Sequence, residues 1–239
     1  MYGLGTLINA AAIILGGILG LLFGKLLKER HQDTLCKTCG ISALFIGIAG
    51  ALEGLLRTEG GSVVSQNGML CVICLALGAL TGELLNIEEG FERFGAWLKI
   101  KTGNARDKQF VDAFVTASLT VCIGAMAIVG AIEDGINGNI SILVTKAVLD
   151  LIIIMVMTCS LGKGCAFSAI PVIILQGSVT ALSVLIRPLL TEEALLNLST
   201  VGSILIFCVG INLVWGKKIP VANLLPAVLF AIIAAFLPF

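Results

Sequence analysis

The chain has 239 residues, of which 58% are hydrophobic and only 13% are charged, and its mean hydropathy is +1.07. Ordinary globular chains contain about 45–50% apolar and about 25% charged residues, so this much apolar surface cannot be hidden in a water-soluble core. Fifteen basic and fifteen acidic residues cancel, which excludes a strongly basic nucleic-acid-binding protein. The composition predicts an all-α, polytopic transmembrane bundle, residues 1–239 forming one integral membrane domain whose partner is the lipid bilayer and not nucleic acid.

Apolar segments long enough to cross a bilayer recur along the whole chain. The first begins without a basic region and continues to Gly24, too long for the apolar core of a signal peptide, so it is predicted to be a span. Eight spans are predicted, at about 4–24, 37–56, 66–85, 110–131, 139–159, 165–186, 198–215 and 220–238. The last two are separated only by Gly216-Lys217-Lys218, and Pro220 and Pro226 interrupt the final one.

The basic residues are divided unequally between the connections. Twelve lie in the first, third, fifth and seventh connections, whereas the even connections contain only Arg57 and Arg187. Because cytoplasmic loops are enriched in Lys and Arg, the odd connections are expected in the cytoplasm and both termini outside.

The third connection contains a helical pattern of its own. In residues 86–101, Phe91, Phe94, Trp97 and Leu98 recur at helical spacing with charges between them. Such a pattern is typical of an amphipathic helix at the membrane interface.

Two pairs of spans resemble each other in sequence. Ile48-Ala49-Gly50-Ala51-Leu52-Glu53 is echoed by Ile128-Val129-Gly130-Ala131-Ile132-Glu133. The preceding spans share a glycine-rich pattern, Gly16-Gly17-Ile18-Leu19-Gly20 and Gly78-Ala79-Leu80-Thr81-Gly82. Residues 1–60 and 66–138 are therefore candidate repeat units, the second lengthened by the amphipathic insert. Small residues three and four apart let helices approach closely, either within one bundle or between protomers of a homo-oligomer.

The fifth predicted span carries two opposite charges. Lys146 and Asp150 are four residues apart, share a helix face and can pair. A span beginning near Asn139 places them roughly 10 and 16 Å into a hydrocarbon layer about 30 Å thick. Each charge costs about 2.5–3.5 kcal/mol at a helix centre, so an intramembrane ionisable residue is by default a functional-site candidate.

Further polar residues complete the candidate solute- or ion-binding set. Gln176 lies in the middle of the next span, at a depth from which its amide could reach Lys146 or Asp150. Asn212 lies in the seventh span, and Glu133 and Asp134 end the fourth. A single amide in a membrane helix more often bonds a neighbouring helix. Glycines and Pro171 permit unwound segments of the kind found in secondary transporters.

Neither an enzyme nor a cofactor is expected. The chain has one histidine and no nucleophile elbow, phosphate-binding glycine loop or His-Glu-x-x-His motif. Eight cysteines include the pairs Cys36/Cys39 and Cys71/Cys74. They are interpreted as small hydrophobic residues, with a cluster assembled in three dimensions left open, and no catalytic or metal-binding residue is assigned.

Several of these motifs together resemble a known family. They are Cys122-Ile123-Gly124-Ala125-Met126-Ala127-Ile128-Val129-Gly130, Gly135-Ile136-Asn137-Gly138, Lys146, Asp150, Gly162-Lys163-Gly164, Gln176-Gly177, Gly210-Ile211-Asn212 and Ala222-Asn223-Leu224-Leu225-Pro226. The chain resembles the YdfK/YqgA-like bacterial inner-membrane proteins, the family of unknown function numbered 554, over nearly its whole length. The resemblance implies a multi-pass inner-membrane protein of the transport or channel kind, without a substrate or mechanism.

Three functions follow from these observations. The first is a secondary transporter of a small, anionic or other solute, with Lys146, Asp150 and Gln176 lining a cavity and Glu133 and Asp134 near its outer mouth. The second is a small-ion channel or pore in which the same residues set selectivity. The third is a membrane scaffold or sensor in which the buried pair only fixes helix register.

Overall fold

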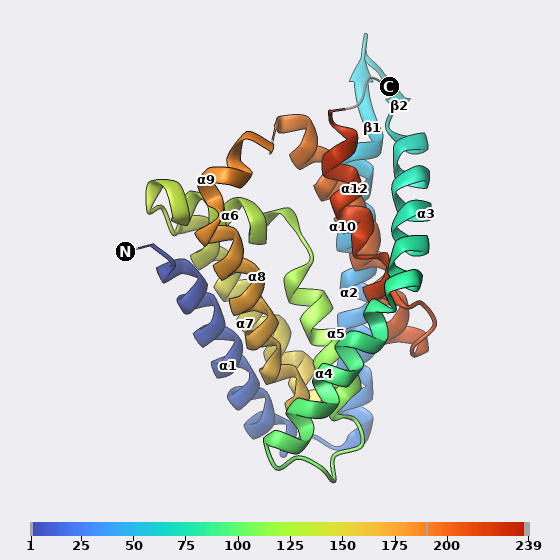
Figure 1. Ribbon diagram of the computed structural model, residues 1–239. Coiled ribbons are helices and arrows are strands. Elements are labelled where there is room, and N and C mark those ends of the chain that lie inside the picture. Colours follow the sequence, from blue (N-terminus) through green and yellow to red (C-terminus); the bar gives the residue numbers. More distant parts are fainter. Residues whose placement is uncertain (1, 190, 237–239) are drawn as a thin grey trace. The chain divides into compact units, whose positions relative to one another are not determined.

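The structure, a computed structural model, describes residues 2–189 and 191–236. They are almost entirely helical, which confirms the predicted fold class (Figure 1). The helices form two compact units, one of Met1–Cys39 with Glu89–Arg187 and the other of Gly40–Glu88 with Pro188–Phe239. These boundaries differ from those of the candidate repeats, whose internal symmetry stays a prediction.

The first unit, called unit 1 below, contains the charged span and its neighbours. Its elements are α1 (Leu4–Gly24), the start of α2 (Glu29–Leu55), most of α4 (Ile87–Lys101), α5 (Phe110–Cys122), α6 (Ala125–Asn137), α7 (Ser141–Leu161), the 3-10 helix η1 (Lys163–Ser168), α8 (Ala169–Ala181) and α9 (Ser183–Ile186). Helix α1 packs along the full length of α7 and also on α8.

Glycines bring α1 and α7 into close backbone contact. A Cβ on Gly16 would lie 2.5 Å from the carbonyl oxygen of Leu151, and one on Gly20 would lie 2.4 Å from that of Met155. The pairs advance together along both helices, so α1 and α7 are parallel. Small residues allow this approach in a membrane, where no hydrophobic effect drives helices together. The glycine pattern of the first span thus serves packing within unit 1, and a homo-oligomer stays a prediction.

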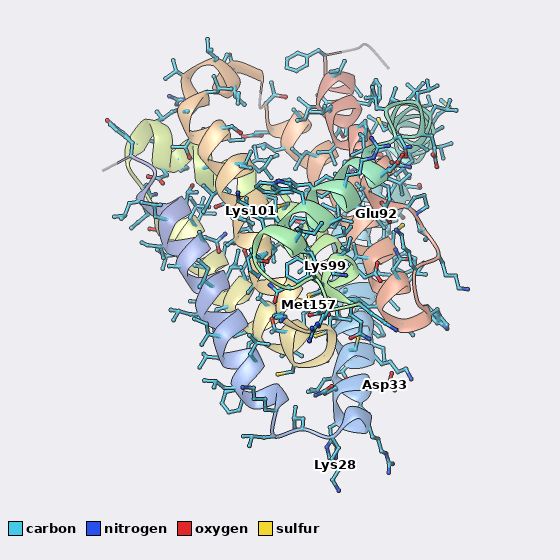
Figure 2. The ribbon with its side chains drawn as sticks, turned by 60° about the horizontal axis from the view of Figure 1, so that its bottom comes forward. Lys28, Asp33, Glu92, Lys99, Lys101 and Met157 are labelled. Carbon is cyan, nitrogen blue, oxygen red and sulfur yellow. The ribbon has the colours of Figure 1, made fainter. Side chains whose placement is uncertain are left out.

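One end of unit 1 gathers the first, third and fifth connections. The start of α5 lies near the end of α7. The Sγ of Cys165, in the η1 helix that follows α7, donates a hydrogen bond over 3.6 Å to the carbonyl oxygen of Ala113 in the first turn of α5. Figure 2 brings this end forward and shows Lys28, Lys99 and Lys101 on it. The basic connections after α1 and before α5 therefore lie at the same end of the unit, as the predicted alternation of spans requires.

The predicted fourth span is broken. Helix α5 stops at Cys122 and α6 starts at Ala125, bent by 62° from it. Gly124 forms the break with a φ of 139°, a conformation that only glycine adopts readily. The change of direction is visible between α5 and α6 in Figure 1.

The residues predicted as an amphipathic insert form helix α4. Its apolar side is partly covered by protein, since the Phe94 ring packs edge-on against Phe114 of α5 at a centroid distance of 5.8 Å. Leu98 is buried, whereas Trp97 is exposed. The position of Trp97 at a membrane interface stays a prediction.

The second unit, called unit 2 below, surrounds the C-terminal helices. Its elements are the remainder of α2, the strands β1 (Leu56–Glu59) and β2 (Ser62–Ser65), α3 (Gly68–Leu85), α10 (Glu192–Trp215), α11 (Val221–Leu224) and α12 (Pro226–Ala234), with η2 (Arg187–Leu189) leading into it. Glycines again mediate close packing: Gly47 of α2 meets Phe207 of α10, and Gly78 of α3 meets Ala227 of α12.

A short antiparallel hairpin follows α2 and was not anticipated from the sequence. Glu59 pairs with Ser62, so Gly60 and Gly61 form a two-residue turn. Both glycines have positive φ, 57° and 83°, as a type I′ turn requires. The Gly60-Gly61 pair, which lies between Thr58 and Val63, was the sequence signal for this hairpin.

The number of spans is close to the predicted eight. Within residues 2–189 and 191–236, six helices are long and apolar enough to cross a membrane, and the bent pair α5 and α6 makes a seventh if it forms one span. The eighth predicted span corresponds to a shorter apolar helical stretch, Val221–Ala234, with α11 and α12 meeting at Leu225. Residues 237 and 238 of that span lie outside the described residues.

Candidate functional site

An ion pair lies on the buried face of α7. Nζ of Lys146 is 2.9 Å from Oδ1 and 2.8 Å from Oδ2 of Asp150, one helical turn away. Lys146 is 7% exposed and Asp150 3%, so the pair faces the interior of unit 1 and not its surface. The helix continues for several apolar residues on both sides, which keeps the pair within the span.

Two amides from other helices stand beside this pair. Nδ2 of Asn9 on α1 donates a hydrogen bond to Oε1 of Gln176 on α8 across 3.4 Å. The Asn9 side chain also lies beside the Asp150 carboxylate. Both amides are buried, at 0% and 1% exposure. The structure therefore brings Lys146, Asp150 and Gln176 into one polar cluster, and Asn9 is the residue that joins them.

The cluster is incompletely hydrogen-bonded. Among the described side chains, Oδ1 of Asn9, Nε2 of Gln176 and Oδ2 of Asp150 are buried and have no hydrogen-bond partner, although that carboxylate oxygen lies beside the ammonium. If both amides are rotated end for end, one N–H₂ and one carbonyl again stay unpaired, but they then belong to Asn9 and Gln176 respectively. The N–H₂ group of Asn9 lies toward the Asp150 carboxylate, which leaves the carbonyl of Asn9 and the N–H₂ of Gln176 as the unpaired groups. Buried polar groups are nearly always paired, so unpaired groups in a protein interior call for a specific explanation.

The broken helix α5–α6 packs against the helix that carries the ion pair. Cys122, the last residue of α5, lies close enough to Lys146 and Asp150 to interact with both charges. Helix α6 begins three residues later, which is at most about 11 Å of extended chain, and both α5 and α6 pack on α7. The last carbonyls of α5 and the first N–H groups of α6 carry opposite partial charges. Gly124 precedes α6 and has no side chain to cap the start of that helix.

Asp134 lies beside the start of α1, and its place near an outer mouth stays a prediction. Its Oδ1 accepts a hydrogen bond from the backbone N–H of Gly3 at 3.2 Å, and its Oδ2 accepts one from Gly5 at 2.9 Å. The residue is 0% exposed. The carboxylate thus caps the start of α1 and compensates the positive end of that helix. Glu133 is half-buried and accepts a hydrogen bond from Asn137 at 2.9 Å.

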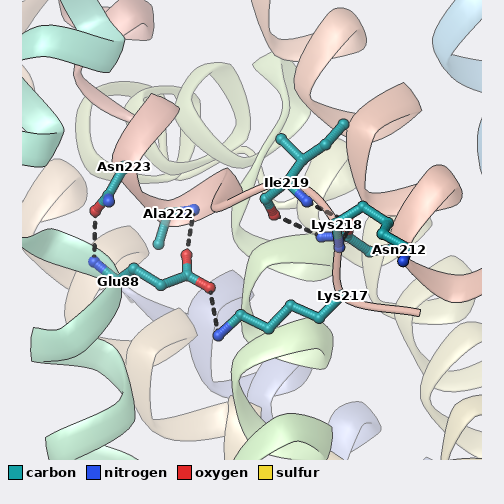
Figure 3. A network of polar contacts seen from close by, with 7 residues as sticks. All are labelled: Glu88, Asn212, Lys217, Lys218, Ile219, Ala222 and Asn223. Carbon is teal, nitrogen blue, oxygen red and sulfur yellow. Dashed lines mark hydrogen bonds and ion pairs between the residues drawn. The ribbon is translucent and has the colours of Figure 1, made fainter.

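Asn212 belongs to unit 2 and orders the turn after α10. Its Oδ1 accepts hydrogen bonds from the backbone N–H groups of Lys218 and Ile219, at 2.9 and 3.0 Å, and its Nδ2 donates to the carbonyl oxygen of Ile219 at 2.7 Å. All three contacts lie within seven residues of Asn212 along the chain. Both polar atoms of the Asn212 side chain are therefore hydrogen-bonded within this local turn (Figure 3).

The same figure shows a reciprocal contact between α3–α4 and α11. The Glu88 carboxylate accepts a hydrogen bond from the Ala222 N–H at 2.9 Å, while Oδ1 of Asn223 accepts one from the Glu88 N–H at 2.7 Å. Lys217 pairs with the other Glu88 oxygen at 3.0 Å. Each side chain thus caps the helix start of the other, which ties the two segments together. Nothing in the sequence pattern indicated this pair.

The cysteines pack as small side chains in this structure. None of the eight forms a disulfide, and Cys71, Cys74, Cys159 and Cys165 are buried. Sγ of Cys159 donates a weak hydrogen bond to the carbonyl oxygen of Gly20 over 3.3 Å.

A multi-pass helical membrane protein with a buried polar cluster is the class that this fold and cluster define. The sequence match to the family of proteins of unknown function DUF554 covers residues 4–236, and the chain belongs to that family. It is similar to the uncharacterized protein YqgA of Escherichia coli (strain K12), with 32% identity over 95% of this chain and 94% of the relative.

It is also similar to the uncharacterized membrane protein YdfK of Bacillus subtilis (strain 168), with 28% identity over 97% of this chain and 95% of the relative. No solved structure matches the chain significantly.

Proposed function

We propose that this protein is a secondary transporter that moves a small solute across the bacterial inner membrane, with Lys146 and Asp150 on the solute's route. The carrying observation is the buried ion pair with unpaired amide groups beside it, on a helix against which the two halves of a broken helix pack. Discontinuous helices that direct their ends at a central site are a recurrent feature of secondary transporters.

In the proposed mechanism the ion pair holds the empty site closed. An anionic group of the solute binds the Lys146 ammonium and the unpaired amide of Gln176, which releases Asp150. The freed carboxylate then takes up a coupling proton or a cationic group, because an unpaired carboxylate inside the protein is strongly unfavourable. Opening toward either side would occur by movement of the helices around the cluster.

The burial of the pair supports a transporter over an open pore. Lys146 and Asp150 are almost inaccessible, as expected of an occluded state, whereas a conducting pore needs a continuous wetted route. The unpaired amide atoms support a binding role over a purely structural one. A polar network that only fixed helix register would gain stability from having every member hydrogen-bonded.

The proposed orientation follows the basic residues. We place the odd connections in the cytoplasm and both termini outside, since one end of unit 1 carries Lys28, Lys99 and Lys101. A C-terminal alkaline phosphatase fusion should be active and a C-terminal green fluorescent protein fusion dark. The reverse pattern would overturn the orientation.

The transport proposal is tested with purified protein in proteoliposomes on a solid-supported membrane. Amino acids, monocarboxylates and alkali chlorides serve as probes. One class should give saturable transient currents that disappear in Lys146→Ala combined with Asp150→Asn. The matched control, Lys37→Ala with Asp33→Asn, removes an exposed pair of the same spacing and should leave the currents unchanged.

Three outcomes would overturn the proposal. Currents that survive the loss of both charges would remove the pair from the route. Unitary conductance in planar bilayers would show a channel. A wild-type protein without any flux, together with full recovery of stability when Lys146 and Asp150 are exchanged, would show a structural pair.

A further inference from the structure

The polar cluster contains two poles of opposite charge, and this inference about its ligand rests on the proposed function. The donor pole consists of the Lys146 ammonium and the free Nε2 of Gln176. The acceptor pole consists of Oδ2 of Asp150, the free Oδ1 of Asn9 and the carbonyl end of α5. Each pole has one formal charge, positive on Lys146 and negative on Asp150, so the cluster as a whole is neutral.

A simple ion fits this arrangement poorly. An anion bound to Lys146 would lie close to the Asp150 carboxylate, and a cation bound to Asp150 would lie close to the ammonium. In either case one charge of the pair is left without its partner in a buried site, which is strongly unfavourable. A ligand with both signs of charge replaces both partners at once.

We infer that the site takes a small zwitterion, a solute with an ammonium and a carboxylate group. Its carboxylate binds Lys146 and Gln176, and its ammonium binds Asp150 and Asn9 near the negative end of α5. The unpaired Nε2 of Gln176 then donates a hydrogen bond to the carboxylate of the ligand, and the unpaired Oδ1 of Asn9 accepts one from its ammonium group. The buried side chains Asn9 and Gln176, at 0% and 1% exposure, carry this assignment independently of the helix ends.

Binding is measured by thermal denaturation of the purified, detergent-solubilised protein. The probes are the twenty standard amino acids, β-alanine and γ-aminobutyrate. At least one should raise the denaturation midpoint in a saturable manner. Its methyl ester, which has only the ammonium, and its N-acetyl derivative, which has only the carboxylate, should bind at least tenfold more weakly.

Single variants test which pole binds which group. Lys146→Met should lose the preference for the zwitterion over its methyl ester, because the carboxylate no longer has a cationic partner. Asp150→Asn should lose the preference over the N-acetyl derivative in the same way. Should either variant fail to fold, Gln176→Leu and Asn9→Leu provide the corresponding changes without altering a charge. The Asp33→Asn/Lys37→Ala protein should keep wild-type selectivity.

The outcomes separate this inference from the transport proposal. If a monocarboxylate or an alkali cation binds better than every zwitterion and its uptake depends on Lys146 and Asp150, the inference is wrong and the transport proposal stands. If Lys146→Met and Asp150→Asn shift selectivity in the same direction, the two-pole assignment is wrong. If no probe binds and none gives a current, both fail.

Discussion

Asn9 and Gln176 form a buried hydrogen bond between α1 and α8 although 167 residues separate them in the sequence. Each amide leaves one of its polar atoms unpaired, next to the Lys146–Asp150 pair. The charged residues of α7 are therefore part of a cluster that three helices build. The following predictions test how this cluster and its supporting contacts contribute to stability.

Removing one member of the buried pair should be worse than removing both. Lys146→Met or Asp150→Leu alone leaves an unpaired buried charge and should destabilise the protein by about 3–5 kcal/mol, whereas the double variant should lose much less. A double-mutant cycle on unfolding free energy measures the coupling. Variants of Lys37 and Asp33, whose side chains are exposed, should show a coupling of only about 0.3–0.5 kcal/mol. Additive single effects at the buried pair would contradict the ion-pair geometry.

A methyl group on the glycine face of α1 should separate it from α7. Gly20→Ala places a Cβ 2.4 Å from the carbonyl oxygen of Met155, and overpacking of this kind costs about 1–3 kcal/mol. Thermal denaturation in detergent should show a lowered midpoint. Gly177→Ala is the matched control, because a Cβ there meets nothing within 4 Å and alanine is the better helix former. Equal effects of the two substitutions would show that α1 does not pack on α7 in this way.

The cap on α1 should depend on Asp134 and not on its neighbour. Asp134→Ala removes both acceptors of the Gly3 and Gly5 N–H groups and should cost about 0.5–2 kcal/mol. Hydrogen exchange should become faster at the start of α1. Glu133→Ala removes only a contact with Asn137 and should leave that exchange unchanged. Similar exchange in both variants would assign Asp134 a different role.

The contact between Glu88 and α11 should depend on the backbone hydrogen bond more than on the ion pair. Glu88→Ala leaves the buried Ala222 N–H unpaired and should cost about 1–3 kcal/mol. Lys217→Met should change stability by less than about 1 kcal/mol, because half of the Lys217 side chain is exposed. Denaturation midpoints of the two variants provide the comparison. A larger loss with Lys217→Met would show that the ion pair dominates.

The sequence by itself determined the class of protein and most of its helices. Hydrocarbon thickness sets the length of a span, and backbone hydrogen bonds inside a span must be local, so both properties can be read from a run of apolar residues. The same rule identified Lys146 and Asp150 as unusual, and their contact could be predicted because both lie on one helix. The Gly60-Gly61 hairpin was also readable from a local signal, although it was overlooked.

Only the tertiary structure decided which distant polar groups meet. In the tertiary structure Asn9 hydrogen-bonds to Gln176, Asp134 accepts hydrogen bonds from the start of α1, and Asn212 hydrogen-bonds within the turn that follows its own helix. Such contacts depend on the rotation and packing of whole helices, which hydropathy does not specify. In a membrane the packing follows from small residues and backbone contact rather than from an apolar face. An apolar helix therefore does not indicate which of its sides its neighbours will cover.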